Sequence, residues 1–355
     1  MIRLLLTLSS VFLLILPAGA QGPLAPPAGP PAAGMKSLQE LWDKVNSQPV
    51  DKRTPISGSV ELVTPGSYYL TQNITSASGT AITISGVGIT LDLNGFTIDG
   101  RNNANGRGIV LVSSARSTRI MNGNILGGVT RSGSVFSAGT FVGISGSNGA
   151  SGLTIERLCI SGARHGIDVK VVVGSVVKDC AVSLCSSHGI RAGTVTGSSA
   201  FLCETTGIEG DTVSGCTAES LGAGSSGVPA GIRGGQVTNC TAKNIGTSGM
   251  AISADNVTDC VAVHSGTGIG IYADVVSNSK STATSGTAIS GTSITNCVAT
   301  STNGSPAIAA DNGTVANCRG STYAGGIAIS ALVATGCVVP SGQSINATVK
   351  ENCVP

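Results

Sequence analysis

Residues 231–260 read GIRGGQVTNCTAKNIGTSGMAISADNVTDC, and this stretch contains one unit twice. In the second copy a small residue precedes Ile252, and Cys260 follows eight positions after that Ile. Asp259, directly before the Cys, is one of the residue types that adopt a left-handed backbone conformation at low cost. The unit therefore combines an apolar position with a fixed bend, and its recurrence is the first thing to test.

The unit recurs nine times from about residue 160 onward. Its first column is always Ile, preceded by Gly or Ala: Ile167, Ile190, Ile208, Ile232, Ile252, Ile271, Ile289, Ile308 and Ile329. Its second column is Cys or Ser: Cys180, Ser198, Cys216, Cys240, Cys260, Ser279, Cys297, Cys318 and Cys337. The residue before the second column is always Asn, Asp or Gly, and a Val or Ile stands three positions before that column in eight of the nine units. Each unit thus predicts a short β-branched strand that enters a bend at a constant point.

Units of 18–24 residues that hold short strands and fixed bends predict a β-solenoid. A single coil cannot bury its own apolar face, whereas stacked coils place like residues on like residues about 4.8 Å apart. Roughly twelve coils would form a rod on the order of 55–60 Å long. Upstream, apolar and polar residues alternate over residues 82–98, which predicts the first coils. Residues 101–107 and 128–142 are expected to form projecting loops.

Two motifs upstream of the repeat resemble bacterial secreted right-handed parallel β-helix repeat proteins. They are PGSYYLT at residues 65–71 and GITLDLNGFTI at residues 88–98, and many Gly-Ile and Val-x-Asn-Cys coils follow them. The resemblance covers about residues 55–340 and implies an all-β chain with a single right-handed, pectate-lyase-like parallel β-helix. It implies little about activity, because this fold carries lyases, hydrolases, epimerases and non-enzymatic surface proteins.

The N-terminal region is predicted to lie outside the β-helix. Residues 1–20 combine a basic start, an apolar run and a small-residue end, which is typical of a signal peptide cleaved after Ala20. Residues 21–35 are rich in Pro, Gly and Ala and are expected to form a linker. The mature chain is therefore expected to be secreted, periplasmic or part of the cell envelope, with no transmembrane anchor after cleavage.

Both ends of the β-helix are expected to be covered. Residues 36–54 contain a capping helix and a lead-in, because Ser37 and Glu40 have capping-box spacing and an apolar face that includes Trp42 follows. A helix of about ten residues is not stable alone in water, so we expect it to cover the open end of the solenoid. Residues 341–355 are interpreted as a C-terminal cap or tail.

The composition excludes some partners and gives no enzyme motif. The formal net charge is only +2, which argues against nucleic acid as a partner. The Asn-Thr-Asp, Asp-Asp and Arg-Ile-Lys motifs of polygalacturonase-like hydrolases are missing. The Arg-x-Pro-x-x-Arg pattern of pectate lyases and the Asp-Pro-His-Glu of alginate epimerases are missing as well.

One group of candidate site residues follows the Ile column. The position after Ile carries alternating charges in four successive units, and a His stands two positions before Ile in the first two of these units; the residues are His165, Asp168, His188, Arg191, Glu209 and Arg233. Side chains next to an inward Ile point outward, so these charges would stack as an exposed ladder. One interpretation is electrostatic matching between coils. The other is a face that grips an acidic or hydroxylated glycan, with Asp168 and Glu209 as candidate acid and base.

The eleven Cys residues do not suggest a metal or cofactor site. Within each column they are separated by whole coils, and the sequence has no Cys-x-x-Cys pair, which is not the spacing of a zinc site. Because Ser replaces Cys in the shared column, we predict mostly free, buried thiols that act as small core residues. Cys185 and Cys203 are predicted to align with Leu221 and Ile245 in a second inward column.

Two functions remain open at this point. The favoured hypothesis is an exported, non-enzymatic β-helix that binds or decorates extracellular or envelope polysaccharide. The alternative is a carbohydrate-active enzyme on an acidic glycan, a lyase or epimerase in preference to a glycoside hydrolase. A converging cluster of carboxylate, His and Arg on one face would favour the enzyme.

Overall fold

The computed structural model describes residues 36–47, 51–133, 135–137, 139–222, 228–303, 305–323 and 325–354. The predicted signal peptide and linker lie outside these ranges, so both stay predictions. The chain divides into two units, Met1–Lys52 and Arg53–Pro355, and each is described by itself.

The first unit contains helix α1 (Leu38–Ser47), which begins at the predicted capping box. The N–H of Glu40 donates to Ser37 Oγ at 3.0 Å, and the N–H of Ser37 donates to Glu40 Oε2 at 2.8 Å. The apolar side chains of Leu38 and Trp42 are exposed. The proposed packing of α1 on the β-helix therefore stays a prediction. Within the described ranges α1 is the sole helix, and its ten residues are too few to span a bilayer.

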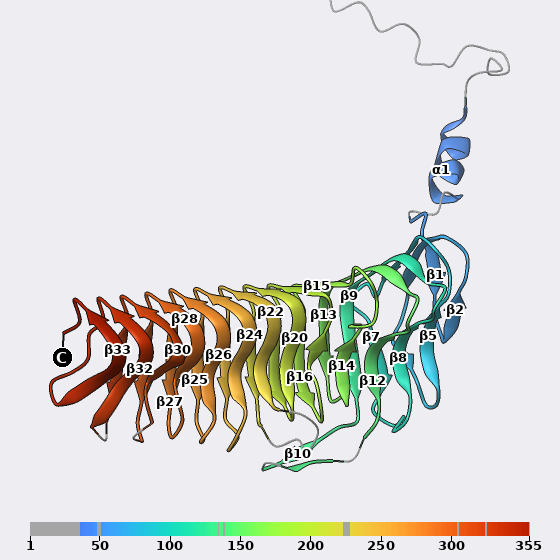
Figure 1. Cartoon of the computed structure of the whole chain (residues 1–355). Helices are drawn as coiled ribbons and strands as arrows, with labels where there is room; N and C mark the ends of the chain where they lie inside the picture. Colours follow the sequence, from blue (N-terminus) through green and yellow to red (C-terminus); the bar gives the residue numbers. More distant parts are fainter. Residues whose placement is uncertain are drawn as a thin grey trace, which may run out of the picture. The chain divides into compact units, whose positions relative to one another are not determined.

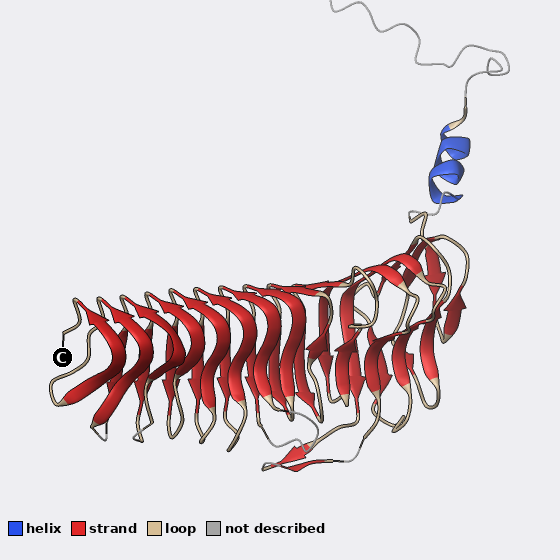
Figure 2. Cartoon of the chain, viewed as in Figure 1, coloured by secondary structure: helices blue, strands red, loops and turns tan. Residues whose placement is uncertain are grey.

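The second unit confirms the all-β class and the single parallel β-helix that the resemblance implies (Figures 1 and 2). Its first coils contain β1 (Thr54–Ile56), β2 (Val60–Leu62), β3 (Gly66–Leu70), β4 (Ile74–Thr75), β5 (Thr80–Ile84), β6 (Ile89–Asp92), β7 (Thr97–Gly100), β8 (Arg107–Leu111), β9 (Arg116–Gly127), β12 (Val142–Gly146), β13 (Ser151–Ser161), β14 (His165–Asp168), β15 (Val176–Lys178) and β16 (Ala181–Cys185).

The later coils are more regular, and most consist of one long and one short strand. They contain β17 (Ile190–Arg191), β18 (Thr194–Thr196), β19 (Ser199–Cys203), β20 (Thr206–Ser214), β21 (Thr217–Ser220), β22 (Ala230–Thr238), β23 (Thr241–Asn244), β24 (Met250–Thr258), β25 (Val261–His264), β26 (Ile269–Ser277), β27 (Lys280–Ala283), β28 (Ile289–Thr295), β29 (Val298–Ser301), β30 (Ile308–Ala316), β31 (Arg319–Thr322), β32 (Gly326–Thr335) and β33 (Gln343–Glu351). A short hairpin, β10 (Arg131–Ser132) and β11 (Val135–Phe136), projects from the stack at the expected 128–142 loop.

The Ile column forms the predicted core. Its nine members pair coil to coil in register, and the column continues upstream through Ile144, Ile109 and Ile82. All of these side chains are fully buried. The Gly or Ala before each Ile also points inward, since a Cβ on Gly189 would lie 2.8 Å from Ala200 Cβ and from Cys203 Sγ. Stacked Ile side chains and small residues beside them thus fill the interior.

The predicted bend is confirmed in all nine units. The residues before the Cys or Ser have φ between 48° and 62°, the left-handed region, whether they are Asn, Asp or Gly. These types tolerate that region because they lack the Cβ clash or relieve it by local hydrogen bonding. The constant corner keeps successive strands in register.

The Cys and Ser column is buried, as predicted, and it has a further role. The Cys240 thiol donates to the carbonyl of Thr238, and its Sγ accepts the N–H of Cys216 in the preceding coil at 3.4 Å. Ser279 Oγ makes the same pair of bonds with Ser277 and Cys260. This column therefore favours a small side chain that both donates and accepts a hydrogen bond at the corner. All eleven Cys are free thiols in the structure, and thiol counting under denaturing, non-reducing conditions tests this state.

One boundary differs from the sequence-based expectation. The β-helix does not end at residue 340, because β33 pairs in register with β32 and places Ile345 on Ile329. Asn352, with φ 49°, and Cys353 repeat the corner, so residues 341–355 contain a tenth unit and are not a separate tail. Ile345 lies eight positions before Cys353, the same spacing as in the other units.

The predicted alignment of Cys203 with Leu221 is wrong by one residue. Cys203 pairs with Ser220, and the column continues with Asn244 and His264. The cause is Leu202, whose left-handed φ of 55° makes β19 one residue longer than β21. In the later coils the inward column is therefore polar at every described position except Ala283.

Candidate functional site

The charged residues after the Ile column stack as the sequence predicts. Asp168 on β14 pairs with Arg191 on β17, which pairs with Glu209 on β20, which pairs with Arg233 on β22. Arg191 Nη1 lies 3.4 Å from Asp168 Oδ1, and its Nε donates to Glu209 Oε2 at 3.1 Å. One guanidinium thus forms ion pairs with carboxylates in the coils on both sides of it.

Arg233 does not continue the chain of ion pairs. Its guanidinium donates to the backbone carbonyl of Val228, before β22. The ladder is therefore a three-residue group, Asp168, Arg191 and Glu209, and the fourth predicted member binds a backbone carbonyl instead.

His165 and His188 lie beside this group and stack on each other. Their ring centroids are 5.4 Å apart at an interplanar angle of 26°. Burial, with Arg164 and Arg191 nearby, lowers the pKa of His165 to about 4. Burial, with Arg191 and His165 nearby, lowers the pKa of His188 to about 4 as well. Both imidazoles are therefore neutral near pH 7, and Ser187 Oγ lies 2.8 Å from His188 Nδ1.

The geometry of the ladder favours its structural interpretation. Asp168 and Glu209 are two coils apart, on the order of 10 Å, and the side chain between them binds both. Each of the two carboxylates is already engaged by the guanidinium of Arg191. The sequence prediction thus located a real cluster, whose polar groups mainly bind one another.

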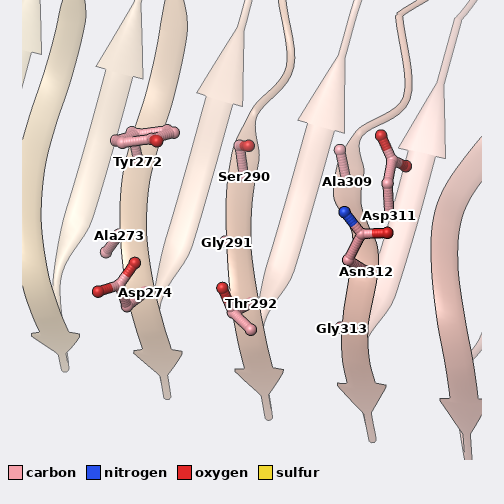
Figure 3. A pocket seen from close by; sticks show the side chains of 10 residues that line it. All are labelled: Tyr272, Ala273, Asp274, Ser290, Gly291, Thr292, Ala309, Asp311, Asn312 and Gly313. Atoms are coloured by element: carbon pink, nitrogen blue, oxygen red, sulfur yellow. The ribbon is translucent and has the colours of Figure 1, made fainter.

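A shallow groove, which the sequence analysis missed, lies farther along the same outer column. It has a volume of about 210 Å³ and spans β26, β28 and β30 (Figure 3). Tyr272 occupies the ladder position three coils after Glu209 and is 51% exposed. Asp274 follows on the same strand, and Asp311 and Asn312 stand on the far side.

The floor and one wall of the groove have identifiable causes. Gly291 and Gly313 form part of the floor, where an added Cβ would collide with the carbonyl oxygens of Ala273 and Thr292. The unit of Ile308 contains two extra residues before its Cys, and the register between β28 and β30 shifts there. Such a bulge turns side chains outward, and here it exposes Asp311 and Asn312. The Ser330 hydroxyl donates to Asp311 Oδ1 at 2.7 Å and orients that carboxylate.

The groove combines an aromatic ring with several hydrogen-bonding groups. Ser290 and Thr292 add hydroxyls between the ring and Asp311. Tyrosine presents an apolar face for stacking, and carboxylate and hydroxyl oxygens bind hydroxyl groups in fixed directions. Within the described ranges, no group of His, Cys, Asp or Glu side chains is arranged to hold a metal ion.

Comparisons with known proteins add the following. No protein-family model matches the chain, and no curated protein matches it. Among solved structures, the chain is similar to the Dettilon tailspike protein, with 14% identity, 84% of this chain covered and a TM-score of 0.41. It spans 60% of that tailspike chain, less than two thirds of its length.

A second similar structure is the A-module of a mannuronan C-5 epimerase from Azotobacter vinelandii. The identity is 12%, the match covers 82% of this chain and 87% of the module, and the TM-score is 0.44.

Proposed function

We propose that this protein is an exported, non-enzymatic β-helix that binds extracellular or envelope polysaccharide through the groove at Tyr272. The observation that carries the proposal is the groove itself, which has an exposed ring and Asp274 on one side, Asp311 on the other and two hydroxyls between them. A pyranose ring offers an apolar face and a rim of hydroxyls, and this set of groups matches both. The groove is open, so it suits a segment within a long polymer.

The non-enzymatic part of the proposal rests on the ladder. Arg191 binds Asp168 and Glu209, and the two His rings are neutral and partly buried. Asp168 and Glu209, the candidate acid and base, are thus engaged in ion pairs between coils. One observation favours the alternative: Asp274 and Asp311 face one groove, and paired carboxylates are the usual machinery of sugar-cleaving enzymes.

Glycan binding by purified protein tests the proposal. Tyr272→Ala should weaken binding to a panel of neutral and acidic polysaccharides by about tenfold, because loss of a stacking ring costs roughly 1–1.5 kcal/mol. Tyr323→Ala is the matched control, since Tyr323 is also exposed but lies outside the groove. Affinity electrophoresis gives the ratio of each variant's dissociation constant to that of wild type. Equal losses in the two variants would contradict the groove, and release of shortened or unsaturated products by wild type would favour the enzyme.

A further inference from the structure

A second charged cluster lies on the earlier coils, away from the ladder and the groove. It contains Arg119 on β9, Glu156 and Arg157 on β13, and Lys178 at the end of β15. The Glu156 side chain is 0% exposed. Arg119 Nε donates to Glu156 Oε1 at 2.8 Å, Arg157 Nη2 donates to the same oxygen at 3.1 Å, and Lys178 Nζ lies 2.7 Å from Oε2. Three cations from three coils thus share one buried carboxylate.

The charges of this cluster do not balance. Burial raises the pKa of Glu156, but Lys178 and Arg119 outweigh burial and hold it below its ordinary value, so the carboxylate is ionised at neutral pH. Three positive charges against one leave a surplus of two, or of one if the exposed Asp179 is included. The next carboxylate in the network, Asp92, is already paired with Arg53 at 2.6 Å.

The cationic groups face solvent although their partner is buried. The side chains of Arg119, Arg157 and Lys178 are 48%, 50% and 39% exposed. Arg157 Nε donates to Asn122 Oδ1 at 2.8 Å, which fixes the plane of its guanidinium. The Nη1 atoms of both Arg residues lie outside the bonds to Glu156. Glu156 therefore acts as an internal template that holds three outward cations in place.

The backbone at Arg157 gives an independent argument. Arg157 occupies the left-handed corner, φ 51°, in the column that contains Asn122 before it and Asp179 after it. Every other residue in this column, from Asn122 to Asn352, is Asn, Asp or Gly. An Arg there is strained, and strain that the fold does not need is a pointer to function. The strain places a cation at the edge of the cluster.

We propose that Arg119, Arg157 and Lys178 form a binding site for one anionic group, a carboxylate or a sulfate ester, of an acidic polysaccharide. The exposed guanidinium groups of Arg119 and Arg157 and the exposed ammonium of Lys178, all held by one buried carboxylate, suit such an anion. Residues 53–191 carry eleven Lys and Arg against six Asp and Glu, which favours the approach of a polyanion to these coils. The inference rests on the proposed function, because it assumes that the bound anion belongs to a glycan. The groove, roughly 30 Å away along the stack, binds hydroxyls instead.

The chain itself supplies the substitutions that test the site. Arg157→Asn introduces the usual corner residue, and Arg119→Thr and Lys178→Thr introduce residues found at the same register in neighbouring coils, Thr154 and Thr196. The matched control is Arg319→Thr, an exposed cation of the later coils in the column that contains Thr217 and Thr241. Binding to polygalacturonate, dextran sulfate and uncharged dextran is measured beside the melting temperature, with and without inorganic sulfate at constant ionic strength.

We expect Arg157→Asn to keep or raise the melting temperature and to weaken binding to the acidic polymers at least about tenfold, with uncharged dextran unaffected. Loss of polygalacturonate binding alone identifies a carboxylate, and loss of dextran sulfate binding alone identifies a sulfate. Unchanged acidic-glycan affinity in the Arg157 and Arg119 variants, or a loss equal to that of Arg319→Thr, overturns the site while the proposed function stands. If wild type binds no glycan, the proposed function fails. The anion site is still established if inorganic sulfate raises the melting temperature of wild type but not that of Arg157→Asn. If sulfate does not have this effect, the anion site is rejected as well.

Discussion

The coils before Leu202 and those after it share a core but differ at the surface. Both keep the stacked Ile column, yet residues 53–191 carry a surplus of five positive charges and residues 192–355 a surplus of four negative charges. Among the described residues after Leu202, each non-glycine residue with a left-handed φ is Asn or Asp, whereas Ser117, Arg157, Leu184 and Leu202 adopt it in the earlier region. The interior thus fixes the fold in both regions. Backbone strain and positive charge are concentrated in the earlier, less regular coils, whereas the groove lies in the later ones.

The largest expected effect tests the part that both regions share. Ile252→Asp would place an unpaired carboxylate in mid-stack at a fully buried position. We expect misfolding or a loss of several kcal/mol of unfolding free energy, measured by thermal or urea denaturation. Ser253→Asp, on the adjacent outward position, is the control and should change little. An unchanged melting temperature in Ile252→Asp would contradict the inward column.

The next prediction concerns pH and compares His165 and His188 with His264 of the later coils. The folded pKa of all three is lowered, to about 4 for the first two, from an ordinary 6.5. Stability is therefore fully present above about pH 6.5 and falls as the pH drops towards 4, because the unfolded chain binds more protons in that window. Melting temperatures across pH 4–8 measure this effect.

A matched variant separates the two regions in the same pH experiment. His264 Nδ1 accepts the N–H of Gly266, and Asn244, one coil earlier, uses its Oδ1 to accept the N–H of Gly246. His264→Asn should keep the fold and remove part of the loss between pH 6.5 and 4. If the slope does not change in this variant, His264 does not titrate in that window, and the effect belongs to the earlier coils alone.

A smaller loss of stability is expected when the corner residue of an irregular coil is placed in a regular coil. Asn239→Arg would place in a regular coil the residue that Arg157 provides in an irregular one. Because a long side chain is disfavoured at φ 51°, we expect a loss of roughly 1–2 kcal/mol in urea unfolding. Thr241→Arg, an exposed position without left-handed backbone, is the control. Equal stability of the two variants would show that the corner tolerates Arg, and the strain argument at Arg157 would fail.

The same contrast explains what the sequence could and could not predict. The corner, the Ile column and the order of Asp168, Arg191 and Glu209 followed from fixed spacings, since in-register stacking converts spacing into contact. Arg119 and Glu156 are 37 positions apart on coils of irregular length, so no period aligned them. The groove depends on a two-residue insertion near Asp311. The insertion is visible in the sequence, but the sequence does not show in which direction its side chains point.

The smallest expected effect concerns the ladder at the junction of the two regions. Arg191→Glu would remove two ion pairs and place a third carboxylate between Asp168 and Glu209. All three side chains are partly exposed, so solvent screens the repulsion, and the loss should be at most about 1 kcal/mol. Arg191→Gln, which removes the pairs without reversing the charge, should lose less. A difference that shrinks at high salt supports an electrostatic origin. In contrast, the ladder would be an active face if wild type turned over pectate, alginate or sulfated glycans and the double variant Arg191→Ala, His188→Ala lost this turnover without unfolding. That result would reject the structural interpretation of the ladder.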